Sequence, residues 1–152
     1  MNIRNYLTHM FFSNVTLFGS PIFYGVVVLG LATVNFSIAL RLFIIMFFLE
    51  ITSAIIKFTY DKQRPGQLTK RKDLWGKYVT RSFPSVHTAR ITTLSVIGME
   101  FYLYLGIIGL GLSIAVGFSR IYLRKHDWLD VVGGIVIGVV FGLVGIGFKM
   151  FY

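Results

Sequence analysis

The sequence contains no cysteine, so disulfide bonds, thiolate metal sites and cysteine nucleophiles are all excluded. Acidic residues are also scarce, at six against 15 lysines and arginines, which leaves a net charge of +9. Charged residues of both signs make up only 14% of the chain, whereas a soluble domain carries about 25%. The N-terminus lacks a short apolar core followed by a small-residue cleavage site, so we expect no removable signal peptide.

Apolar residues dominate what is present. Hydrophobic residues make up 55% of the chain and aromatic residues 16%, and the mean hydropathy is +0.74. The 152 residues are enough for one domain, and a soluble fold of this size would leave much apolar surface in water. We therefore predict a single membrane-embedded domain over residues 1–152, an all-α multi-pass transmembrane helical bundle of about five spans. Each span needs about 20 residues. The predicted spans lie near Pro21–Leu40, Leu42–Phe58, Thr88–Tyr104, Leu105–Phe118 and Leu129–Phe151.

The segment Met1–Gly19 has a different composition, because apolar and aromatic side chains alternate there with polar ones. This mixture is typical of a helix that lies in the membrane interface. An extension of the first helix that packs on its neighbours explains the pattern equally well. Both interpretations stay open at this level.

The basic residues gather in a polar segment, the predicted active-site loop 59–86, and in the turn Arg120–Asp127. Basic loops between apolar stretches suit anionic lipid headgroups or phosphate better than nucleic acid, so we predict no nucleic-acid partner. Counting crossings places both segments and the N-terminus on one membrane face. The opposite face carries little charge beyond Arg41 and Lys149.

Three clusters of polar residues lie on the first of these faces. In the first cluster, Pro65 disfavours helical geometry at Arg64, so we expect Lys57 to close the second span and Arg64 to lie just beyond it. In the second, Ser85 is suited to cap the third span, whose free N–H groups form a natural phosphate site with His87 at its edge. Each cluster alone has an ordinary structural explanation.

The third cluster contains Arg120, His126 and Asp130. On a helix, residues four apart share a face, so Asp130 can fix the tautomer of His126 and stabilise positive charge on its ring. A histidine nitrogen can itself attack phosphorus. A charge at Asp130 is costly, since an apolar span begins there.

Together the clusters supply what phosphoryl transfer needs: a nucleophile, cations or N–H donors around the phosphate oxygens, and an acid for the leaving group. His126 is the predicted nucleophile, Asp130 orients it, and His87 is left as general acid. The remaining predicted phosphate-binding residues are Lys57, Arg64, Ser85, Val86 and Arg120. No carboxylate cluster of metal-binding type accompanies them, so we expect neither a metal nor a cofactor.

These residues form three motifs that resemble the signatures of the type 2 phosphatidic acid phosphatase superfamily, which also includes bacterial acid phosphatases and vanadium haloperoxidases. The motifs are Lys57-x6-Arg64-Pro65, Pro84-Ser85-x-His87 and Ser119-Arg120-x5-His126-x3-Asp130. The resemblance implies a helical bundle, no metal requirement, a phosphohistidine on His126 and protonation of the leaving group by His87. The family usually has glycine where this chain has Val86, and we expect Val86→Gly to retain or raise turnover.

The predicted function is therefore that of a membrane lipid phosphatase acting on a polyprenyl diphosphate, phosphatidylglycerol phosphate or phosphatidate type of lipid. A weak or inactive lipid-phosphate-binding protein and a lipid phosphotransferase are the alternatives, and a haloperoxidase is disfavoured because the site sits on membrane spans. The expected location is a bacterial inner membrane. The basic loops favour a cytoplasmic site, but a phosphate site needs the same charges on either side.

Three further features invite structural predictions. Glu50 lies inside a predicted span, so it should pair with Arg90 or with Lys57. Glu100 is interpreted as an end residue that reaches toward the headgroups. A stripe of small residues in the last span favours close packing inside the bundle over a dimer interface, and it consists of Gly134, Gly138 and Gly142.

Overall fold

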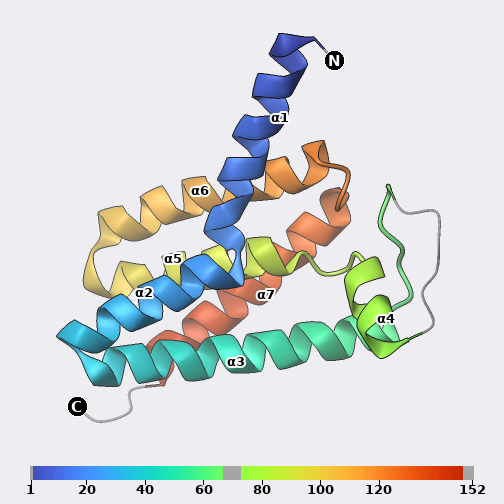
Figure 1. Ribbon diagram of the computed structural model, residues 1–152. Helices are drawn as coiled ribbons and strands as arrows, with labels where there is room; N and C mark the ends of the chain where they lie inside the picture. The colour runs from blue at the N-terminus through green and yellow to red at the C-terminus, as the bar shows by residue number, and fades with distance from the viewer. Residues whose placement is uncertain (1, 67–72, 149–152) are drawn as a thin grey trace.

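The computed structural model describes residues 2–66 and 73–148, and these form helices without a strand. Their long helices pack into one bundle, so the predicted all-α class is confirmed (Figure 1). The elements are α1 (Ile3–Val15), the 3₁₀ turn η1 (Thr16–Gly19), α2 (Pro21–Val34), α3 (Phe36–Thr59), α4 (Leu74–Thr80), α5 (Val86–Phe101), α6 (Leu103–Tyr122) and α7 (Trp128–Gly147).

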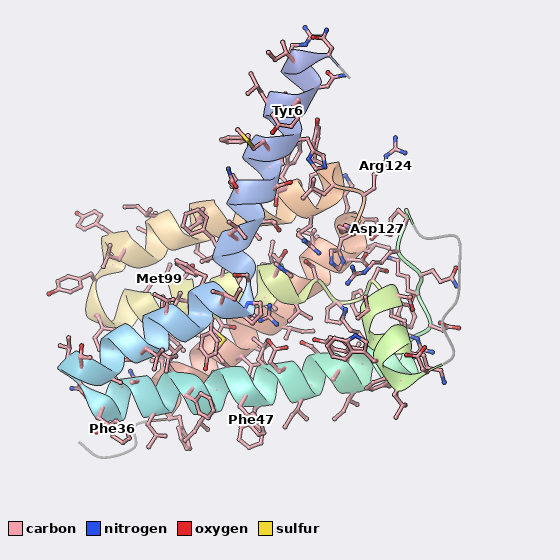
Figure 2. All side chains as sticks on the ribbon, viewed as in Figure 1. Tyr6, Phe36, Phe47, Met99, Arg124 and Asp127 are labelled. Atoms are coloured by element: carbon pink, nitrogen blue, oxygen red, sulfur yellow. The ribbon has the colours of Figure 1, made fainter. Side chains whose placement is uncertain are left out.

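Within the described residues, three helices are long and apolar enough to cross a membrane: α3, α6 and α7. A fourth crossing is possible if α1 with η1 and α2 form one span, which bends by 46° between the two parts. Phe36 and Phe47 point outward from α3 (Figure 2), and both are more than half exposed, as expected of side chains that face lipid. The third predicted span, Thr88–Tyr104, corresponds to α5, which has only 16 residues.

The short helix α5 occupies the centre of the bundle and packs most extensively against α6 and α7. Its neighbours shield it from lipid, so it can carry polar residues such as Thr92 and Thr93, both fully buried. The glycine stripe of α7 makes this contact close. A Cβ built on Gly138 would lie 2.5 Å from the Cβ of Thr92 and 2.7 Å from the carbonyl oxygen of Ala89. Packing inside the bundle is thus the role of the stripe.

The predicted boundary between the first two spans, near Leu40, is wrong. Asn35 ends α2 and caps α3, and its Oδ1 accepts a hydrogen bond from the backbone N–H of Ile38 at 3.1 Å. Asparagine is among the best N-cap residues, and this local signal outweighs the charge of Arg41. Arg41 instead lies inside α3, buried, with its guanidinium 2.8 Å from the carboxylate of Glu100. Glu100 does lie at the end of α5, as expected, and its carboxylate pairs with Arg41.

The predicted loop 59–86 contains a short helix that the polar composition did not indicate. Asp73 begins α4 by accepting a hydrogen bond from the backbone N–H of Gly76 at 2.9 Å. The loop residues 67–72, with several of its basic side chains, lie outside the described residues, as does Lys149.

The N-terminal segment is helical and has no buried residue in α1. Phe12 is its main point of contact, since the ring centroid lies 4.2 Å from that of Tyr122 and 6.0 Å from that of Phe118. The rest of α1 projects away from the bundle and runs across the direction of the long helices (Figure 1). This placement fits a helix in the membrane interface, anchored to α6 at one point.

Candidate active site

Four helix ends meet at one end of the bundle: the C-termini of α3 and α6 and the N-termini of α5 and α7 (Figure 1). The three sequence clusters lie on these ends or in the loops beside them. The structure therefore brings together residues that are up to 73 positions apart, from Lys57 to Asp130. Most of the set is buried although it is polar, namely Lys57, Ser85, Arg120, His126 and Asp130.

His126 and Asp130 lie side by side where α7 begins. Nδ1 of His126 is 3.4 Å from Oδ2 of Asp130, and this nitrogen has no closer polar partner among the described residues. Contrary to expectation, the two residues do not share a helix face, because α7 begins only at Trp128 and His126 precedes it. The contact is long for a hydrogen bond, as catalytic contacts without substrate often are.

Asp130 is held in place from several directions. It forms a capping box with Asp127, in which each side chain accepts from the other's backbone N–H at 3.1 Å. Its carboxylate also accepts from Ser82 Oγ at 3.3 Å and lies 2.9 Å from Lys62 Nζ. The side chain is 0% exposed, so these donors replace the water that a carboxylate normally needs.

The surroundings of His126 favour a neutral ring. Burial lowers its pKa to about 4, and the positive charges of Arg120, Arg64 and Lys57 add to this effect. The carboxylate of Asp130 opposes the shift without reversing it. At neutral pH the ring therefore keeps an unprotonated nitrogen, which is the form that can attack an electrophile.

The second cluster builds the start of α5. Ser85 occupies the N-cap, but its Oγ does not cap the helix as predicted, because it lies 2.9 Å from Thr88 Oγ1. Its backbone N–H donates to the carbonyl of Asp130 at 2.9 Å, which joins the starts of α5 and α7. The first backbone N–H groups of a helix have no intrahelical acceptor, so those of α5 remain available to an anion beside His87.

Val86 adopts an ordinary helical backbone at the start of α5. The only described non-glycine residue with positive φ is Arg124, so the valine is not strained. Its side chain belongs to the hydrophobic core, together with Leu49 and Ala89. The side chain therefore serves packing between α3 and α5, and the backbone N–H stays available at the helix start.

Three cations face the site without an acidic partner among the described residues: Lys57, Arg64 and Arg120. The ammonium group of Lys57 donates to the carbonyl of Arg81 at 3.1 Å and lies 5.0 Å from the ring centroid of Tyr78. The Nε atoms of both arginines are buried and have no hydrogen-bond partner within residues 2–66 and 73–148. Buried positive charge of this kind is stabilised by an anion.

Several residues around the site were not predicted from the sequence to have a role. Lys62 lies 2.7 Å from Asp127 as well as close to Asp130, and these carboxylates raise its pKa despite the effect of burial. Thr16 Oγ1 accepts from Arg120 Nη1 at 3.2 Å, so the N-terminal segment reaches the site. Such contacts join residues far apart in the chain and leave no local sequence pattern.

The sequence left Arg90 and Lys57 as possible partners of Glu50. The structure pairs Glu50 with Arg90. Arg90 also donates to the carbonyl of Gly19 at 3.0 Å, which fixes η1 against α5. A Cβ at Gly19 would lie 2.6 Å from the carbonyl oxygen of His87, so only glycine permits this close approach. The pair thus holds the N-terminal segment beside the site. No group of three histidine, aspartate or glutamate side chains within residues 2–66 and 73–148 is placed to hold a metal ion.

The sequence model of the PAP2 superfamily matches residues 38–150. The chain belongs to the PAP2 superfamily. Among solved structures, this PAP2 protein is similar to the transmembrane PAP2 type phosphatidylglycerolphosphate phosphatase from Bacillus subtilis, with a TM-score of 0.78 and 19% identity over 96% of this chain and 80% of that one. It is also similar to LpxE from Aquifex aeolicus, with a TM-score of 0.79 and 23% identity over 93% of this chain and 87% of that one.

A search of curated proteins finds no match. The apolar helices and the transmembrane relative together identify this PAP2 chain as an integral membrane protein.

Proposed function

We propose that this PAP2 protein is a lipid phosphatase that hydrolyses a lipid phosphate or diphosphate through a phosphohistidine on His126. The observation that carries the proposal is a buried, neutral His126 beside Asp130, facing cations that have no acidic partner among the described residues. A neutral imidazole is a nucleophile, and unpaired cations stabilise the charge that spreads over phosphate oxygens during transfer. Lipid phosphates are the expected substrates because the site lies at the ends of membrane helices.

The proposed reaction has two steps. In the first, the unprotonated nitrogen of His126 attacks phosphorus, the P–O bond to the lipid breaks, and the leaving oxygen takes a proton from His87. In the second, water attacks the phosphohistidine, the P–N bond breaks, and His87 accepts the proton of the water. The products are inorganic phosphate and a lipid that carries one phosphate fewer.

The bound phosphate also explains how His87 could act as an acid. Burial of its ring, followed by the positive charges of Arg120, Arg90 and Arg64, disfavours the protonated form. A bound phosphate brings two negative charges, which offset these cations and favour the imidazolium form. In this proposal, binding of the substrate favours protonation of His87, which then acts as the acid.

The test is the release of inorganic phosphate by the protein purified in mild detergent, with a chelator present. The panel contains phosphatidylglycerol phosphate, the type of substrate named for the similar Bacillus protein, together with phosphatidate and a polyprenyl diphosphate. We expect release from at least one lipid, abolished in His126→Ala. A folded protein that binds these lipids but releases nothing would favour the inactive lipid-binding alternative. Transfer of phosphate to an added lipid alcohol in place of water would indicate a phosphotransferase.

We also propose that the protein resides in a bacterial inner membrane, since both similar structures come from bacteria. Separation of inner and outer membranes, followed by detection of the protein, tests this location.

A further inference from the structure

A cavity bordered by Arg64 lies at the same end of the bundle as the candidate active site. It has a volume of about 290 Å³ and is lined by Arg64, Gly66, Leu123, Arg124 and Lys125. Figure 2 shows Arg124 reaching outward from the turn between α6 and α7, at the same end of the bundle as Asp127. The volume is at the lower end of the range for small-ligand pockets.

The cavity differs from the catalytic site in its lining. Of the residues proposed to bind the reacting phosphate, only Arg64 borders it. His87, Arg120 and His126 do not. Arg64 therefore borders the cavity and also lies close enough to His126 for its positive charge to disfavour protonation of that ring.

The three basic residues of the cavity make no ion pair with a described residue, a property that they share with Lys57 and Arg120 but not with the neighbouring Lys62 and Arg81. Lys62 is paired with Asp127 and Asp130, and Arg81 with Asp61. Arg64, Arg124 and Lys125 have no such partner, and Nε of Arg64 is buried without a hydrogen bond. Like charges around one cavity repel each other, and an anion between them removes the repulsion.

The backbone gives a second reason to regard Arg124 as placed for its side chain. It follows the C-cap Leu123 of α6 and has a φ of 53°. Helices usually place glycine in this left-handed position, because a side chain there is strained. Arg124 nevertheless adopts this backbone conformation beside the cavity, and its side chain is exposed to solvent at the cavity's rim. The carbonyl of Arg124 also lies 3.1 Å from where a Cβ of Gly66 would be, so the two loops that line the cavity pack closely.

We propose that Arg64, Arg124 and Lys125 form a second phosphate-binding site, separate from the catalytic one and joined to it through Arg64. The ligand is a phosphate group, either inorganic phosphate or the headgroup of an anionic phospholipid. Guanidinium groups match the geometry of phosphate oxygens and bind them through paired hydrogen bonds. The assignment rests on the proposed function only in counting the catalytic site as the first phosphate site.

The test is calorimetric titration of inorganic phosphate into the detergent-purified native chain. We expect two binding events, and only one in the double variant Arg124→Gly with Lys125→Gln. Arg124→Gly relieves the left-handed backbone, so loss of binding in this variant cannot be ascribed to a strained turn. Lys125→Gln alone should weaken the second event by about tenfold. Arg4→Gln removes one charge at the exposed N-terminal end of α1 and should leave both events intact.

The source of the phosphate is separated by repeating the titration in nanodiscs. If anionic lipid is the ligand, discs containing phosphatidylglycerol show one event for inorganic phosphate, while discs of pure phosphatidylcholine show two. If free phosphate is the ligand, both discs show two. A single event for the native chain in phosphatidylcholine discs, or two events in the double variant, overturns the proposal.

These binding results do not depend on turnover. Two binding events without hydrolysis would reject the proposed function and support the second site. Hydrolysis by a chain that shows a single event in phosphatidylcholine discs would support the proposed function and reject the second site.

Discussion

Asp130 is the residue at which most of the site's contacts converge. Its side chain contacts His126, Ser82, Lys62 and the backbone of Asp127, and its carbonyl accepts from Ser85. A buried carboxylate with this many donors stays ionised and fixed in position. It can therefore orient the ring of His126 while it remains unprotonated itself.

The charge state of His126 gives a prediction that does not depend on substrate. Burial lowers the pKa of its ring to about 4, from an ordinary value of about 6.5. As the pH falls, the ring should therefore stay neutral through 6.5 and become protonated only near 4. ¹⁵N signals of histidine-labelled protein in detergent, assigned with His126→Ala, measure this titration. A midpoint near 6.5 would mean that the ring is far more hydrated than its burial indicates.

The packing of Val86 adds an effect on protein stability that the motif alone does not predict. Its side chain is part of the core between α3 and α5, so Val86→Gly should lower the stability of the protein by about 2 kcal/mol or more. Turnover per folded molecule should be retained, because the backbone N–H at the helix start is unchanged. Thermal unfolding and phosphate release, measured on the same preparation, separate the two effects. A variant with unaltered melting temperature would contradict the packing role.

At the scale of elements, the contact between α5 and α7 decides how the site is assembled. The short central helix carries His87 and the last helix begins beside His126, so their spacing sets the distance between the two histidines. Small residues along α7 allow this contact. The interpretation of the glycine stripe as internal packing needed only its spacing, which lies within one helix. The identity of the partner helix was not accessible from sequence.

Gly138→Ala tests this contact directly. The added Cβ would lie 2.5 Å from the Cβ of Thr92, so the helices must separate. We expect a loss of about 1–3 kcal/mol in stability and a lower rate of phosphate release. Gly111→Ala is the matched control, because a Cβ at Gly111 meets nothing within 4 Å and alanine favours a helix. Equal melting temperatures for both variants would show that the stripe does not limit packing.

At the scale of the whole molecule, the bundle has an ion pair toward each of its two ends. One end holds the candidate site with the pair Glu50–Arg90 just below it, and the other holds the pair Arg41–Glu100. Each pair links α3 to α5. The two ion pairs therefore link the same two helices at different distances from the candidate site.

Neutralising each glutamate separates stability from site geometry. Glu50→Gln and Glu100→Gln should each lower stability by about 1–3 kcal/mol, since each removes a hydrogen-bonded charge pair. Only Glu50→Gln should also lower phosphate release, because Arg90 then loses one of the contacts that hold Gly19 beside His87. The melting temperature and the initial rate of phosphate release, compared between the two variants, separate an effect on stability from an effect on the site. An equal loss of rate in both would place the effect in general stability.

The site was predictable from sequence to the extent that its residues occur in motifs with fixed local spacing. Lys57, His87 and Arg120 stand at helix ends, with Arg64 in the loop that follows α3, and apolar periodicity locates such ends to within a few residues. Contacts such as Arg120 with Thr16, 104 positions apart, depend on how helices pack and have no local signal. The break at Asn35 was missed for another reason, since a single capping residue interrupts an otherwise continuous apolar stretch.

The hydrogen bond from Ser85 N–H to the carbonyl of Asp130 has a consequence for motion. It joins the start of α5, which carries the proposed acid His87, to the start of α7, which follows the proposed nucleophile His126. The bond limits relative movement of the two histidines, so we expect turnover without closure of the protein around its substrate. The turnover rate would then be limited by the exchange of lipids at the site, as one lipid leaves and the next diffuses in. It should therefore rise with the fluidity of the membrane.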